Sequence, residues 1–219
     1  MNFFYNSNLS PANLKINPKY YFYLKLLICL NPLIFSFVVI YTDFVDYKGV
    51  TESAKYISIA QKWLGYSTGE VLQEVNRLPL YPIFISLIFK IFGNDNLVAL
   101  LITQSLLGVL TFFYLIKTLK LLGLGSSIII LLTLFFNLHI IYRFSLFYPN
   151  CLFIFLLTLF VYNFTYFFFN KSKKHFYFMC LAIFLMLLTR PIFQLSIFLT
   201  FPIIIVIVLK QPLSKLLKL

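Results

Sequence analysis

Long uncharged apolar runs separated by short polar segments dominate the amino-acid sequence. A helix that crosses a bilayer needs about 20 apolar residues, and about 17 to 25 are tolerated. The last two runs cannot form one helix, because 34 residues at about 1.5 Å each would exceed a hydrocarbon core of about 30 Å. We therefore expect about six transmembrane helices, in residues 26–42, 96–116, 121–142, 144–170, 176–189 and 191–209.

The segment RLPLYPIFISLIFKIFG, residues 77–93, is a seventh apolar stretch that starts with two prolines. Pro79 and Pro82 suit the first turn of a helix and not its interior. Ser86 and Lys90 lie four residues apart, which places them on one stripe of such a helix, opposite its Ile, Leu and Phe residues. The pattern is typical of a helix that lies in the membrane interface, although length alone does not exclude a crossing.

The distribution of charge favours the interfacial position for this segment. If it does not cross, ten lysines lie on one face of the membrane and all six acids on the other, as the positive-inside rule requires. If it crosses, the eight lysines from Lys117 onward move to the outer side. The lysines are Lys15, Lys19, Lys117, Lys120, Lys171, Lys173, Lys174, Lys210, Lys215 and Lys218, and the acids are Asp43, Asp46, Glu52, Glu70, Glu74 and Asp95.

This topology divides a single membrane domain into sides. We expect the protein in the inner (cytoplasmic) membrane of a cell. Residues 1–21 and the tail 210–219 then lie on the cytoplasmic side, and residues 43–93 form a loop on the outer side. The loop contains a second amphipathic helix, AKYISIAQKWL at residues 54–64. Its polar face carries Lys55, Ser58 and Lys62, and its apolar face carries Tyr56, Ile59, Ala60 and Trp63. We expect the two surface helices to form a platform over the bundle.

Composition excludes a soluble globular protein. Hydrophobic residues make up 61% of the chain and charged residues only 11%, with a mean hydropathy of +0.93. The net charge of +12 is explained more simply by lysine beside anionic lipid than by nucleic acid. The fold class is therefore an all-α integral membrane protein, whose first span is expected to remain as an anchor, since no cleavable signal peptide is evident.

The sequence assigns no metal site and no disulfide. Cys29, Cys151 and Cys180 fall inside apolar runs, where a thiol behaves as a small hydrophobic group. His139 and His175 have no Cys, His or carboxylate at ligand spacing. No cofactor follows from these residues, and a divalent-metal requirement is left open.

The three arginines are the candidate binding residues. Arg77, Arg143 and Arg190 all fall at the outer interface in this topology, whereas lysine supplies nearly all the inner charge. A guanidinium binds phosphate through two parallel hydrogen bonds and stays ionised when partly buried. The three could form a pocket for a lipid-linked phosphate; alternatively, each extends from a helix end towards water.

Three motifs occur in an order that resembles a known family. They are ESAKYISIAQ at residues 52–61, RLPLYP at 77–82 followed by an apolar stretch ending in FG, and LLTRP at 187–191. Together they resemble the N-terminal part of membrane glycosyltransferases of the GT-C fold. The group is that of the protein mannosyltransferases and the bacterial lipid A aminoarabinose and galacturonic acid transferases, glycosyltransferase family 39.

The resemblance implies transfer of a sugar from a polyprenyl-phosphate donor to a hydroxyl of a lipid, glycan or protein, at the outer face of the cytoplasmic membrane. Glu52 takes the place of the family's general base, with Asp43 and Asp46 as alternates. Arg77 and Arg190 would neutralise the leaving phosphate, and Tyr81 would help to line the pocket. Arg143 is also a candidate phosphate-binding residue, because it falls at the outer interface with the other two arginines.

Two departures from the family lead to alternatives. Asn150 stands where many relatives carry a glutamate, and the chain is about half the usual length of such enzymes. The chain is therefore a fragment, a truncated relative, or one half of an enzyme completed by a partner chain. The alternative function is a non-catalytic membrane protein that binds lipid-linked phosphate or serves as a subunit of a larger assembly. A transporter is disfavoured because paired intramembrane charges and an internal repeat are not evident.

Overall fold

A computed structural model describes residues 18–42, 51–66, 77–124 and 147–190, together with residues 129 and 133. Within these ranges the regular elements are all α-helices. They are α1 (Pro18–Thr42), α2 (Thr51–Trp63), α3 (Leu80–Phe92), α4 (Leu97–Leu121), α6 (Asn150–Asn170) and α7 (Lys173–Leu187). The span predicted at 191–209 lies outside the described residues, and of the span predicted at 121–142 the structure describes residues 121–124, 129 and 133.

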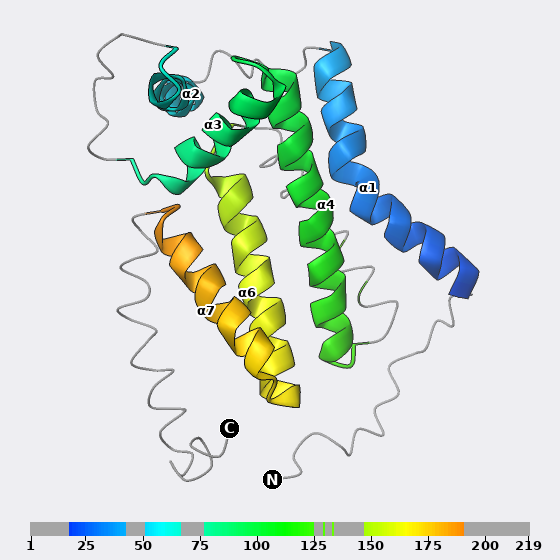
Figure 1. Ribbon diagram of the computed structural model, residues 1–219. Coiled ribbons are helices and arrows are strands. Elements are labelled where there is room, and N and C mark those ends of the chain that lie inside the picture. Colours follow the sequence, from blue (N-terminus) through cyan, green and yellow to red (C-terminus); the bar gives the residue numbers. More distant parts are fainter. Residues whose placement is uncertain are drawn as a thin grey trace.

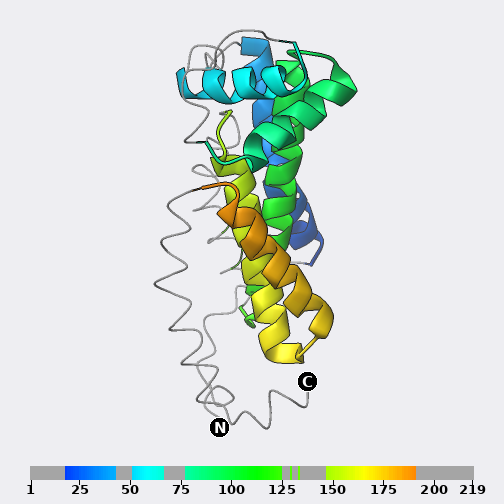
Figure 2. The same cartoon turned by 60° about the vertical axis from the view of Figure 1, so that its left-hand side comes forward.

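Helices α1, α4, α6 and α7 run lengthwise, and α2 and α3 lie across one end of them (Figure 1). Helix α4 packs between α1 and α6, and α7 packs against α6. Helices α2 and α3 contact each other at one end, and Figure 2 shows α2 extended across that end. We call this the platform end, and the opposite end, where α4 and α6 finish and α7 begins, the lysine end.

Three helices are long and apolar enough to cross a membrane: Lys19–Tyr41, Leu97–Leu121 and Asn150–Asn170. The chain is thus a membrane protein, as predicted. Helix α7 has 15 residues, or about 22 Å at 1.5 Å per residue, and is shorter than the about 30 Å core. The first span begins earlier than predicted and contains Lys25, which lies 5.0 Å from the ring centroid of Tyr21.

The chain direction gathers most of the described lysines at one end, whereas Lys55, Lys62 and Lys90 lie at the platform end. Helices α1 and α7 run towards the platform end, whereas α4 and α6 run away from it (Figure 1). Helix α3, which has 13 residues, lies obliquely at the platform end between α1 and α4 in sequence. The lysines of α1, of the last turns of α4 and of the α6–α7 turn therefore share the lysine end, whereas Asp95 lies at the platform end in the α3–α4 turn.

Helix α3 has the boundaries and the two faces that its sequence predicts. It follows Pro79 and ends at Gly93, whose φ of 100° suits a residue without Cβ. Its inner face buries Tyr81, Pro82, Ile85, Ile88 and Phe89. Lys90 is exposed on the other face and Ser86 is half-buried. The buried face packs into the main apolar cluster, together with residues of α2, α4, α6 and α7.

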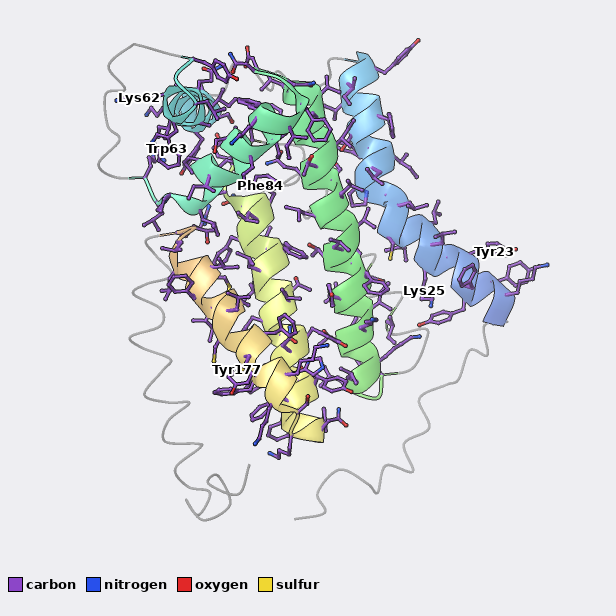
Figure 3. The ribbon with its side chains drawn as sticks, viewed as in Figure 1. Tyr23, Lys25, Lys62, Trp63, Phe84 and Tyr177 are labelled. Carbon is purple, nitrogen blue, oxygen red and sulfur yellow. The ribbon has the colours of Figure 1, made fainter. Side chains whose placement is uncertain are left out.

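Helix α2 agrees with its predicted pattern except at its last residue. Tyr56, Ile59 and Ala60 are buried against the rest of the platform end. Trp63 was expected on the same face, but it ends the helix and is 49% exposed (Figure 3). The indole therefore lies outside the apolar cluster, in a position suited to lipid or interface.

Small polar residues join α1 to α4. The hydroxyls of Ser36 and Ser105 share a short hydrogen bond, and each also lies within hydrogen-bond distance of the carbonyl four residues earlier in its own helix. Since each hydroxyl has one proton, one of them donates to the other and that other donates to its own helix. Gly108 is buried one turn further along α4. Small side chains allow two helices to approach closely where the hydrophobic effect between them is weak, as it is in lipid. Close packing at these serines therefore anchors the platform-end half of α1.

Pro32 bends α1 away from α4 beyond this contact. A proline inside a helix removes one backbone hydrogen bond and clashes with the preceding turn. Pro32 lies near the middle of α1. Figure 1 shows that the N-terminal half of α1 diverges from α4 towards the lysine end.

We predict that Phe89→Ala strongly destabilises the protein. Phe89 is fully buried in α3, and truncation of a buried phenylalanine costs about 3–5 kcal/mol. Phe92→Ala is the matched control, because Phe92 is 57% exposed at the end of the same helix. Thermal unfolding in lipid nanodiscs should show a much lower midpoint for Phe89→Ala than for Phe92→Ala. Equal midpoints would mean that the inner face of α3 is not packed as described.

Candidate functional site

A backbone hydrogen bond brings the two arginine motifs together at the platform end. The N–H of Leu80, in the first turn of α3, donates to the carbonyl of Leu188 at a distance of 3.2 Å. Leu80 belongs to the RLPLYP motif and Leu188 to the LLTRP motif. The segments that carry Arg77 and Arg190 are therefore neighbours in the fold.

Arg77 ties its motif to α2. Its Nη1 donates to the Tyr56 hydroxyl at 3.1 Å, and its guanidinium carbon lies 5.0 Å from the centroid of the same ring. A guanidinium over an aromatic ring gains a cation–π attraction and keeps its charge. Arg77 itself is half-buried, so the tyrosine orients a cation that still reaches the surface.

Tyr81 supports this arrangement from inside the protein. Its ring meets that of Tyr56 edge to face, with centroids 5.2 Å apart, and stacks on Phe84 at 6.1 Å. The side chain has no exposed surface. The sequence led us to expect Tyr81 along the wall of a pocket, and that role stays a prediction; in the structure its ring packs against Tyr56, the hydrogen-bond partner of Arg77.

Gln104 of α4 is the central polar group beneath the platform. Its Nε2 donates to the Tyr81 hydroxyl at 2.7 Å and to the Cys151 sulfur at 3.0 Å, so it joins α3, α4 and α6. Its Oε1 is buried and has no hydrogen-bond partner among the described residues. Our sequence interpretation missed this residue. The signal was an amide in the middle of the apolar run 96–116.

Arg190 donates a hydrogen bond to the neutral side chain of Asn150. Its Nη2 donates to Oδ1 of Asn150 in a short hydrogen bond, and its guanidinium carbon lies 6.0 Å from the Phe153 ring centroid. An amide accepts this bond without cancelling the positive charge. Among the described residues no carboxylate contacts Arg190.

Several predicted site residues cannot be placed in this geometry. Asp43, Asp46 and Arg143 lie outside the described residues. The backbone of Glu52 lies in the first turn of α2, directly after Thr51, whereas its side chain is not described. An acid in a first helical turn is stabilised by the helix dipole, which is independent of any catalytic role. The assignment of Glu52 as a base remains a prediction.

The charged and thiol groups that the structure describes do not form a metal centre. Groups of three or more His, Cys, Asp or Glu side chains able to hold an ion are absent from the described ranges. Cys29, Cys151 and Cys180 are free thiols. What the platform end offers is positive charge held by aromatic and amide groups, an arrangement that can bind an anion.

None of the known protein-family models matches this chain, and comparisons with curated proteins and with solved structures gave no match either.

We predict that Tyr81 ionises above the ordinary tyrosine range. Burial raises the pKa of its phenol well above 10, because the charged phenolate loses its hydration; Cys151 and Tyr56 raise it further, whereas the Gln104 hydrogen bond lowers it. In the folded protein, Tyr81→Phe should therefore leave the tyrosinate absorbance unchanged at about pH 10, where accessible tyrosines are half ionised. A smaller absorbance in the variant would show that Tyr81 is accessible to solvent.

Proposed function

We propose that this chain is a membrane glycosyltransferase, or the N-terminal part of one, that acts at the outer face of the cytoplasmic membrane. It transfers a sugar from a polyprenyl-phosphate donor to a hydroxyl of a lipid, glycan or protein. In this proposal the platform end is the outer end and holds the donor phosphate. A partner chain or a further part of the protein completes the donor pocket.

The observation that carries the proposal is the juxtaposition of the Arg77 and Arg190 motifs. The Leu80–Leu188 hydrogen bond joins the two motifs, although they are far apart in the sequence. Both guanidiniums are half-buried and are oriented by neutral groups, namely the Tyr56 hydroxyl and the Asn150 amide. Guanidiniums in such surroundings favour phosphate, because charge-assisted bonds strengthen as water is excluded.

The position of the site at the platform end suits a lipid-linked donor. A polyprenyl chain stays in the hydrocarbon, and its phosphate lies at the interface. The exposed side of α3, with Ile83 and Leu87, and the half-exposed Trp63 offer apolar surface at the same end. The donor could thus keep its lipid beside the platform while its phosphate contacts the arginines.

The proposed chemistry is a single displacement at the anomeric carbon. The acceptor hydroxyl oxygen forms a bond to that carbon, and the bond between the carbon and the phosphate oxygen breaks. The electron pair leaves with polyprenyl phosphate, whose negative charge Arg77 and Arg190 stabilise. The hydroxyl proton passes to a carboxylate, for which Glu52 is the candidate and Asp43 and Asp46 are the alternates.

The second candidate function is binding without catalysis. Asn150 favours it, since an amide at this position cannot act as the acid found in the resembling enzymes. The site would then retain a lipid-linked phosphate as a binding or assembly module. Both functions require the same arginines, and they differ in their dependence on Glu52.

We predict that Arg190→Ala lowers the affinity for polyprenyl phosphate by about 10- to 100-fold. Loss of a charge-assisted hydrogen bond costs about 1.5–3 kcal/mol. Affinity can be measured from ligand-induced thermal shifts in nanodiscs of neutral lipid. Lys90→Ala is the control, because Lys90 is an exposed cation on α3 away from the joined motifs, and it should change affinity by no more than about twofold.

Transfer of sugar from a polyprenyl-phosphate donor, assayed on the same preparations, separates the two functions. Glycosyl transfer that is lost in Glu52→Gln while phosphate binding is kept supports the enzyme. Binding without turnover in the wild-type chain and in native membranes supports the binding module. Unchanged affinity in both Arg77→Ala and Arg190→Ala would refute the site itself.

We predict that Asn150→Glu weakens phosphate binding by about tenfold. The new carboxylate would pair with Arg190 and compete with the ligand for its guanidinium. Asn150→Gln is the matched control, since it has the same added length without charge. Stronger binding in Asn150→Glu than in Asn150→Gln would contradict a role for Arg190 as the phosphate ligand.

A further inference from the structure

A groove with a positively charged mouth lies between α1 and α4 towards the lysine end. Its volume is about 480 Å³, and its lining includes Phe22, Cys29, Val109, Lys25, Lys117 and Lys120. The remaining lining residues are apolar. The volume falls within the about 300–1,000 Å³ that is usual for ligand sites.

The bend of α1 at Pro32 accounts for the groove. The Ser36–Ser105 contact holds the two helices together on the platform side of the bend. On the other side the N-terminal half of α1 diverges from α4 (Figure 1). Figure 3 places Lys25 on this diverging half of α1. The space between the helices therefore widens towards the end where the lysines lie.

The three lysines lie over aromatic rings, and two of them share the ring of Tyr21. The Nζ atoms of Lys25 and Lys120 lie 5.0 and 5.6 Å from the centroid of the Tyr21 ring. The Nζ of Lys117, one turn before Lys120, lies 4.2 Å from the Phe113 ring centroid. No carboxylate occurs in the lining of the groove. Like charges this close repel each other unless an anion lies between them.

The Tyr21 hydroxyl, whose ring lies beside Lys25 and Lys120 although it does not line the groove, lacks a hydrogen-bond partner among the described residues. The Tyr21 oxygen is inaccessible to solvent and makes no hydrogen bond to any described residue. A buried hydroxyl without a partner is unfavourable, and it can donate to an anion. The ring beneath two ammonium groups thus carries a spare donor.

We propose that this groove binds one anionic phospholipid, with an acyl chain along the apolar wall and its phosphate held by Lys25, Lys117 and Lys120. The lysines match the charge of the headgroup, and the apolar lining matches the chain. Each lysine can lay its methylene stem on the helix while its ammonium group reaches the headgroup region. The inference does not depend on the proposed sugar transfer, because the groove lies at the other end of the bundle.

The test compares thermal unfolding in nanodiscs of phosphatidylcholine with and without phosphatidylglycerol. The wild-type midpoint should rise by about 4 °C with the anionic lipid, since a ligand that binds only the folded state stabilises it. The combined variant Lys25→Gln, Lys117→Gln, Lys120→Gln should lose this shift. The matched control is Lys171→Gln, Lys173→Gln, Lys174→Gln, which removes the same charge from the α6–α7 turn and should keep it.

Three results would overturn the proposal. The first is an equal loss of the shift in both triple variants, which would indicate general surface charge. The second is a shift of the same size when inorganic phosphate is added to phosphatidylcholine discs, which would indicate a free-anion site. The third concerns Val109→Trp, which fills the groove without changing charge and can be tested if the triple lysine variant fails to fold. The proposal is overturned if Val109→Trp keeps the shift of the midpoint.

Discussion

The hydrogen bond from Leu80 N–H to the Leu188 carbonyl is the contact on which the platform end depends. The first N–H groups of a helix and its last carbonyls have no partner within that helix. Where lipid keeps water away, such groups must be satisfied by the protein itself. One hydrogen bond pairs a free N–H at the start of α3 with a free carbonyl at the end of α7. It holds together the neighbouring segments that carry Arg77 and Arg190.

The two ends of the bundle hold positive charge in different ways. At the platform end each arginine has a neutral partner of fixed geometry, the Tyr56 hydroxyl or the Asn150 amide. At the lysine end, Lys25, Lys117 and Lys120 lie over aromatic rings, and their flexible stems do not fix the position of the charge. A planar guanidinium held in place suits a directed phosphate contact, whereas flexible ammonium groups suit a lipid headgroup of variable position.

Local signals in the sequence predicted the elements better than the contacts between them. Pro79 before α3, Pro82 in its first turn and Gly93 after it mark that helix. Asn96 caps α4, because its side chain accepts a hydrogen bond from Ala99 N at 3.0 Å. The earlier start of α1 was missed because Lys25 interrupts the uncharged run. The link from Gln104 to Tyr81 and Cys151 could not be predicted, since it depends on how three helices pack. The same holds for the pairing of Arg190 with Asn150, of which the sequence shows only the two residues.

Helix α4 connects these features because it contacts α1, α3 and α6. Near the platform end, two side chains of α4 join it to its neighbours by hydrogen bonds. Gln104 bonds to α3 and α6, and Ser105 bonds to the platform-end half of α1. Further along, where Pro32 has turned α1 away, such bonds are replaced by an open groove. Hydrogen bonds between described residues therefore hold the helices together near the platform end, whereas beyond Pro32 helices α1 and α4 meet through apolar contacts such as Ile28 with Phe112 and leave beside them a groove that a ligand can fill. In a membrane that role falls to lipid, and the charge of the three lysines decides which lipid is favoured.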